Sequence, residues 1–448
     1  MQKIICFILV LIASITSVYA ETIDKTLTKM GINKGAVSVM IKNVQTGDTV
    51  YALNETTPMH PASTLKLITS SAAVDTLGAD YVFKTQLYKS VNNDLYLKLS
   101  GDPLLKSQDL EKLIQAAKNK KIVPKSIYID DSVFDKNEWG EGWQWDDELN
   151  PLMPKFSAYN LNKNLLGFEI SPTTNGSPAV IVKHSNYPLT FMNYTKTTLN
   201  GGSNVGVAKN EDIPNILNIV GNVSKKMTVT VPIKNPKLNF ILSLEEVIKN
   251  VRFEYYSKIT SAKLPEKNVY LVDEIEHGLD KILPLIIKNS DNLSAETLFK
   301  AAGAVYAKSQ GTFENSKQML DAYFEKLNIN SDDIKIVDGS GVSKNNLMTA
   351  EFMTDFLVGK TSEENFETFK TLLPTPSEGT LKNRMLYFKD NLYAKTGTLA
   401  ETSAIAGYIT SKRGRFYAFD IMINDAKTSS ADKKNIEEQI LRTLYVNY

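Results

Sequence analysis

Cysteine, histidine and arginine are scarce in this chain of 448 residues, and each scarcity argues against a class of function. The single cysteine, Cys6, has no second cysteine with which to form a disulfide. The three histidines form no H-E-x-x-H motif and no pair at helical spacing, so we expect no catalytic metal and no other cofactor. Only five of the 51 basic residues are arginine and the formal net charge is +1, so we expect no nucleic-acid partner.

Long hydrophobic runs are also missing. The apolar run at residues 4–12 is shorter than the about 20 residues that a membrane-spanning helix needs, which makes a membrane anchor the less favoured alternative. Because this run follows Lys3 and precedes the cleavage-site pattern Val18-Tyr19-Ala20, we predict that residues 1–20 are a secretory signal peptide. The mature chain would begin at Glu21 without any thiol, which excludes a cysteine nucleophile. We expect a soluble protein exported to the periplasm or another extracytoplasmic space.

Hydrophobic patterning predicts that the two ends of the chain build one sheet together, with helices between them. We therefore assign residues 21–84 and 272–448 to one domain. Residues 85–167 and 233–271 are interpreted as an inserted domain, because residues 95–129 have a strand, helix, strand pattern. Residues 168–232 are rich in Asn, Thr and Gly and are expected to form a β-rich insertion nested within it. A single continuous domain is the alternative.

Three short motifs carry the chemical argument: S-x-x-K at Ser63–Lys66, S-D-N at Ser290–Asn292 and K-T-G at Lys395–Gly397. Each is weak alone, because lysine is abundant and a second S-x-x-K occurs at residues 430–433. Their order and context are more specific. The first motif opens a buried helix, the second lies in a polar break between two helices, and the third ends a strand. This is the motif set of serine β-lactamases and penicillin-binding proteins.

These residue types at this spacing suit acyl transfer to a serine. Position i+3 on a helix lies beside position i, so Lys66 can take the proton of Ser63, the candidate nucleophile. A lysine can act as a base only when it is neutral, and burial together with a second cation, Lys395, would favour that state. We expect Ser290 to relay a proton to the leaving amine and Asn292 to hold both the substrate and the lysine.

The strand that carries K-T-G is expected to bind the substrate. The backbone N–H groups of Ser63 and Thr398 are candidates for the oxyanion hole. Lys395 and Thr398 are candidates for binding a substrate carboxylate. Thr396 and Gly397 lie on the same strand and are also expected to contact the substrate.

At this point the chain resembles a known family, the D-alanyl-D-alanine carboxypeptidase/endopeptidase group of class C low-molecular-mass penicillin-binding proteins, also called the penicillin-binding protein 4 type. Further matching stretches are G-D-P at 101–103, D-D-S at 130–132, G-W-Q-W-D-D at 142–147, D-G-S-G at 338–341 and G-T-L at 379–381. The resemblance implies an α/β (α+β) serine β-lactamase-like transpeptidase fold with a large inserted domain. It also implies that peptidoglycan stem peptides acylate Ser63 and that β-lactams are covalent inhibitors.

Two further substrate contacts follow from the resemblance. An aspartate at the position matching Asp147 binds the free amino group of the third stem residue in the family, and Arg384 is a weaker candidate for the carboxylate of a diaminopimelate end. The alternative for Asp146 and Asp147 is that they only cap a turn. The alternative for Asp338 is that it is only a turn residue. The alternative for the tryptophans near Asp147 is that they serve only in packing.

Two rival functions remain open from the sequence. A serine β-lactamase would use the same nucleophile but release the drug quickly, and the long insertion argues against it. A non-hydrolytic β-lactam or peptidoglycan sensor would keep the motifs and only report occupancy. The oligomeric state is not indicated by the sequence.

Overall fold

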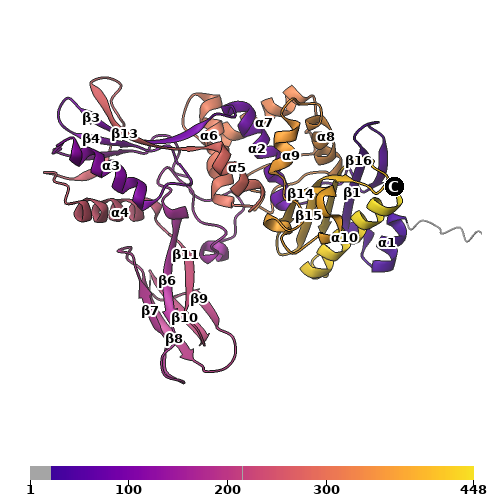
Figure 1. The fold of residues 1–448 in the computed structure, drawn as a ribbon, viewed down its shortest axis with the longest axis horizontal. Coiled ribbons are helices and arrows are strands. Elements are labelled where there is room, and N and C mark those ends of the chain that lie inside the picture. The colour runs from indigo at the N-terminus through magenta and orange to yellow at the C-terminus, as the bar shows by residue number, and fades with distance from the viewer. Residues whose placement is uncertain (1–21, 214) are drawn as a thin grey trace, which may run out of the picture.

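The two ends of the chain form one five-stranded antiparallel sheet, as the patterning predicts (Figure 1). The computed structural model describes residues 22–213 and 215–448, so the predicted signal peptide lies outside the described residues. The strand order is β14-β15-β16-β1-β2. The strands are β1 (Val37–Asn43), β2 (Thr49–Leu53), β14 (Leu392–Thr398), β15 (Thr402–Thr410) and β16 (Phe416–Asn424).

Helices cover both faces of this sheet, which explains why β15 is an almost unbroken buried run and does not alternate. One face packs against α1 (Ile23–Met30) and α10 (Ser430–Asn447). The other face packs against a helical cluster whose core includes Ala406 and Ala418 of the sheet. The helices of that cluster are α2 (Lys66–Leu77), α5 (Leu279–Ile287), α6 (Asn292–Ala307), α7 (Phe313–Leu327), α8 (Ala350–Lys360) and α9 (Phe366–Leu372).

A second five-stranded sheet, of order β12-β5-β4-β3-β13, lies at the opposite end of the molecule (Figure 1). The chain enters it on β3 and leaves it on β13, and these neighbouring strands pair from Val82 with Gly278 onward. Two helices pack on this sheet and supply its own hydrophobic core. The elements are β3 (Val82–Ser90), β4 (Leu95–Lys98), α3 (Ser107–Asn119), β5 (Ile127–Asp130), α4 (Pro236–Val251), β12 (Ile259–Ser261) and β13 (Val269–Gly278).

Residues 165–232 form a separate arm of strands that extends from the rest of the molecule (Figure 1). Two three-stranded sheets, of order β11-β6-β7 and β8-β10-β9, share one small core that contains Phe168 and Ile219. The strands are β6 (Leu165–Ser171), β7 (Val180–Lys183), β8 (Thr190–Thr197), β9 (Asn204–Lys209), β10 (Ile216–Val223) and β11 (Met227–Pro232). We call this unit the β-arm below.

The helical cluster brings three distant parts of the chain together. Small buried residues of α2, among them Ala72 and Ala73, join Ala301 and Ala302 of α6 in one core, and small side chains allow helices to approach closely. The end of β14 lies against the turn that precedes α2. This arrangement places the starts of α2 and α6 beside the edge strand of the first sheet. The mixed helix and sheet architecture agrees with the expected fold class.

Candidate active site

Ser63 lies in a short 3₁₀ turn, η2 (Ala62–Leu65), directly before α2. In a 3₁₀ turn the side chains at positions i and i+3 are eclipsed, so Lys66 stands over Ser63. The Lys66 Nζ atom lies 2.9 Å from Ser63 Oγ. The turn begins with Ala62 at a φ of 47°, a left-handed conformation that is unfavourable for alanine and that clusters at functional sites.

The S-D-N motif forms the start of α6. Asp291 is the N-cap residue of this helix and accepts a hydrogen bond from the Ser294 N–H. Asn292 is the first helical residue. Its Oδ1 atom accepts a hydrogen bond from Lys66 Nζ at 2.7 Å, and its Nδ2 atom donates to the Leu152 carbonyl at 2.7 Å. The amide therefore joins Lys66 to a loop of the inserted region.

The K-T-G motif closes the site from β14. Lys395 Nζ donates to Ser290 Oγ at 2.9 Å, so the second and third motifs are in direct contact. A β-carbon added to Gly397 would lie 2.9 Å from the backbone nitrogen of Ser63 and 2.8 Å from the Pro61 carbonyl oxygen. Only a glycine leaves room for the strand to approach the nucleophile this closely. The structure thus brings together Ser63, Lys66, Ser290, Asn292 and Lys395.

Burial dominates the electrostatics of the two lysines, whose side chains are both fully buried. It lowers the pKa of Lys66 to about 8, against the opposing influence of the nearby carboxylates, of which Asp338 acts most strongly. Burial and the positive charge of Lys66 hold the pKa of Lys395 well below its usual range. Two close ammonium groups in one buried site repel each other, so the empty site favours one neutral lysine.

The turn that contains Asp338 and Ser340 supports Lys66. The Ser340 carbonyl accepts a hydrogen bond from Lys66 Nζ at 2.5 Å. Asp338 holds this turn in place by accepting hydrogen bonds from the N–H groups of Gly341 and Ser343, both at 2.7 Å. The same carboxylate accepts from the indole Nε1 of Trp143 at 2.9 Å. Asp338 therefore links the turn at Ser340 to the loop that carries Trp139, Trp143 and Trp145, which we call the tryptophan-rich loop below. The D-G-S-G motif was the available signal, but it did not reveal this partner.

Glu296 is a second residue whose role the sequence did not show. It lies one helical turn after Asn292, is fully buried, and accepts a hydrogen bond from the Gly339 N–H at 3.0 Å. Burial, followed by the charge of Asp338, raises the pKa of Glu296 to about 8. A charged Glu296 in turn raises the pKa of Lys66. The protonation states of these two side chains are therefore coupled.

The remaining predicted site residues lie around this centre. Asp147 is half-buried in the 3₁₀ segment η3 (Trp145–Leu149) of the loop that Asn292 contacts. Thr398 is exposed at the end of β14, next to Gly397. Arg384 forms an ion pair at 2.5 Å with Glu437 of α10, so a substrate carboxylate would have to share its guanidinium with Glu437. Thr396 is nearly buried within β14.

No metal site or membrane helix accompanies this arrangement in the described chain. Residues 22–213 and 215–448 contain no group of three or more His, Cys, Asp or Glu side chains that could hold a metal ion. In the same residues, no helix combines the length and apolar character required to cross a membrane.

Comparison with known proteins places the chain among D-alanyl-D-alanine carboxypeptidases. A D-alanyl-D-alanine carboxypeptidase of Actinomadura sp. is 26% identical over 434 residues, which cover 90% of this chain and 80% of that protein. The carboxypeptidase DacB of Haemophilus influenzae is 25% identical, with 91% of both chains covered. The crystal structure of H. influenzae penicillin binding protein 4 superposes with a TM-score of 0.82 at 23% identity, covering 95% of this chain and all of that one. The same H. influenzae protein complexed with a β-lactam gives a TM-score of 0.78 at 22% identity, covering 95% of this chain and 99% of that chain.

The family assignment rests on a match over nearly the whole sequence. Residues 19–445 match the family described as D-Ala-D-Ala carboxypeptidase 3 (S13), and this span includes all three motifs. The chain belongs to the D-Ala-D-Ala carboxypeptidase 3 (S13) family.

Proposed function

We propose that the protein is a serine D,D-carboxypeptidase and D,D-endopeptidase that cleaves peptidoglycan stem peptides through an acyl-enzyme on Ser63. One observation carries the proposal: in a member of this family, the Nζ atom of a fully buried lysine lies 2.9 Å from the oxygen of the expected nucleophile. Export to the periplasm fits this substrate and rests on the predicted signal peptide at residues 1–20.

The acylation step follows from the hydrogen bonds in the site. Neutral Lys66 takes the proton of Ser63, and Ser63 Oγ attacks the carbonyl carbon of the penultimate D-alanine. The oxyanion that forms is stabilised by the N–H groups of Ser63 and Thr398. Ser290 passes the proton that Lys66 took to the nitrogen of the departing D-alanine, and the bond between this nitrogen and the carbonyl carbon breaks. Water then hydrolyses the ester, which restores Ser63 and releases the shortened peptide.

The two lysines divide their roles according to charge. Without substrate Lys395 is the more easily deprotonated lysine, because burial and, after it, the charge on Lys66 lower its pKa. Lys395 is left to hold the substrate carboxylate by hydrogen bonds, and Lys66 acts as the base once it has lost its own proton.

Contacts to the rest of the stem peptide are assigned to Asp147, Thr396, Gly397 and Thr398. Asp147 is proposed to bind the free amino group of the third stem residue, since it lies on the loop that Asn292 holds against the site. A half-buried carboxylate should select a cation more strongly than an exposed ion pair, which is worth about 0–1 kcal/mol. Arg384 is retained as a candidate for a diaminopimelate carboxylate, in competition with its ion pair to Glu437.

The function is tested by release of D-alanine from a stem pentapeptide. Wild-type protein should release D-alanine, and Ser63→Ala should release none while keeping the melting temperature of the wild type. Nitrocefin should give a burst of hydrolysis without sustained turnover, because β-lactams acylate Ser63 and remain bound. Sustained nitrocefin turnover would show a β-lactamase, and an acylated protein that releases no D-alanine would show a sensor.

A further inference from the structure

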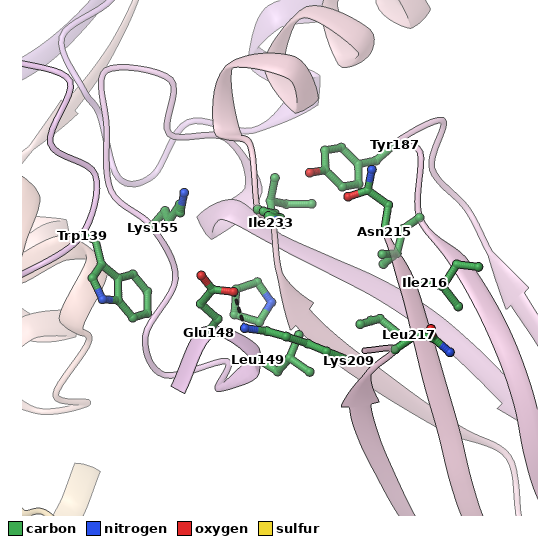
Figure 2. A pocket seen from close by; sticks show the side chains of 14 residues that line it. Trp139, Glu148, Leu149, Lys155, Tyr187, Lys209, Asn215, Ile216, Leu217 and Ile233 are labelled. Atoms are coloured by element: carbon green, nitrogen blue, oxygen red, sulfur yellow. Dashed lines mark ion pairs between the residues drawn. The ribbon is translucent and has the colours of Figure 1, made fainter. Parts of the chain in front are cut away.

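A cleft separates the tryptophan-rich loop from the β-arm (Figure 2). Its volume is about 780 Å³, counting the space that is open to solvent. Trp139 lies at one end, and Leu149, Tyr187, Leu217 and Ile233 form apolar parts of the wall (Figure 2). Apolar walls combined with a few polar groups are typical of ligand sites. None of the residues with a proposed catalytic role lines this cleft.

The charged groups of the cleft favour an anionic ligand. Three lysines and one glutamate line it, which leaves a formal excess of two positive charges. Glu148 and Lys209 form an ion pair that spans from the loop to β9 and joins the two walls (Figure 2). The Lys155 ammonium lies 3.8 Å from the Glu138 carboxylate, a loose contact. Lys234 is exposed and has no ion-pair partner within the described part of the chain.

The loop that forms one wall of the cleft also forms part of the active site. Its Leu152 carbonyl accepts the hydrogen bond from Asn292, and its Trp143 donates to Asp338. Glu148, which lines the cleft, directly follows Asp147 in the sequence. The cleft therefore begins one residue beyond the group that is proposed to bind the third stem residue.

We propose that this cleft is a subsite for the acidic residue that precedes the third residue of a peptidoglycan stem. The proposal rests on the function proposed above, since it requires the stem to lie with its third residue at Asp147. Because Glu148 lines the cleft directly after Asp147, a stem whose third residue is bound at Asp147 would have the neighbouring residue close to the mouth of the cleft. Its carboxylate binds Lys234 and Lys155, and the apolar wall packs against the aliphatic part of the peptide.

The test is a comparison of kcat/KM between two pentapeptides and two lysine variants. One pentapeptide carries D-glutamate at its second position, and the other carries the neutral amide, D-glutamine. Wild-type protein should cleave the acidic peptide several-fold faster. Lys234→Gln should reduce this preference by up to about five-fold, and Lys234→Glu should reduce it further, in line with a partly exposed ion pair. Lys196→Glu makes the same charge change on an exposed residue of the β-arm that does not line the cleft, and should keep the preference.

The outcomes separate the subsite from the function itself. Equal preference for the acidic peptide in wild type, Lys234→Glu and Lys196→Glu would overturn the subsite, even though D-alanine is still released. An equal loss of kcat/KM for both peptides in Lys234→Glu would also overturn the subsite proposal, because Lys234 would then not recognise the carboxylate. Absence of D-alanine release from every peptide by the wild type would instead contradict the proposed function. The penicillin acylation level of each variant measures how much of the protein is folded and competent.

Discussion

The pH dependence of acylation should report the protonation of Lys66. With a pKa of about 8, the side chain is neutral in about one tenth of molecules at pH 7. A lysine with the usual pKa near 10.4 would be neutral in roughly one of a few thousand molecules. Burial therefore raises the fraction of competent base by a factor on the order of 300. The second-order rate constant for penicillin acylation should rise with pH and level off above about pH 8.

Glu296→Gln tests one contribution to the pKa of Lys66. A charged Glu296 raises the pKa of Lys66, but with its own pKa of about 8 Glu296 carries that charge in only part of the molecules in which Lys66 titrates. Removing the charge should therefore move the rise in the acylation rate toward lower pH by a fraction of a pH unit. Glutamine keeps an oxygen that can accept the hydrogen bond from Gly339. Asp338, Asp291 and Lys395 also face Lys66 or act on its charge, and they are unchanged in this variant.

The assay is the rate of labelling by a fluorescent penicillin between about pH 5.5 and 9.5. Glu314→Gln, an exposed residue of α7, is the matched control and should keep the wild-type profile. A flat profile in the wild type, or a rise that moves toward higher pH in Glu296→Gln, would refute the reasoning. Retention of the wild-type melting temperature in both variants separates an electrostatic effect from unfolding.

Four further changes have distinct expected outcomes. Lys66→Ala should reduce acylation by both penicillin and peptide by a factor on the order of 10² to 10⁴, measured as the initial labelling rate, because it removes the general base. Lys395→Ala should weaken acylation by ligands that carry a carboxylate more than acylation by esters that lack it, as measured in a competition assay. Asp147→Ala should abolish most of the preference for a pentapeptide with lysine or diaminopimelate over a diacetylated tripeptide, as seen in kcat/KM, and nearly preserve penicillin acylation. Gly397→Ala should slow acylation by tenfold or more, since its new methyl group would collide with the turn at Ser63.

The proximity of Ser63 and Lys66 was predictable from the sequence because it is local. Ser63 and Lys66 are three residues apart on one turn, and Asn292 begins a helix whose apolar pattern is visible. The pairing of the chain ends was also predictable, because β1 and β16 are both strongly apolar strands.

The residues that support the candidate site could not be predicted from the sequence, because their roles depend on contacts between distant segments. Asp338 receives its hydrogen bond from Trp143, which is 195 residues away in the sequence. Glu296 becomes coupled to Lys66 only when α6 packs against α2. Arg384 comes shortly after the G-T-L stretch at 379–381, but no local pattern indicates its ion pair with Glu437 on α10. The parallel pairing of β8 and β10 in the β-arm likewise leaves no local signal.

Mass spectrometry of the protein treated with penicillin tests the central claim most directly. The account predicts that one peptide, the one containing Ser63, gains the full mass of the drug, because the opened ring stays esterified to the serine oxygen. It also predicts that folded Ser63→Ala gains no mass. An adduct on a different peptide, or an adduct that survives in Ser63→Ala, would contradict the assignment of Ser63 as the nucleophile.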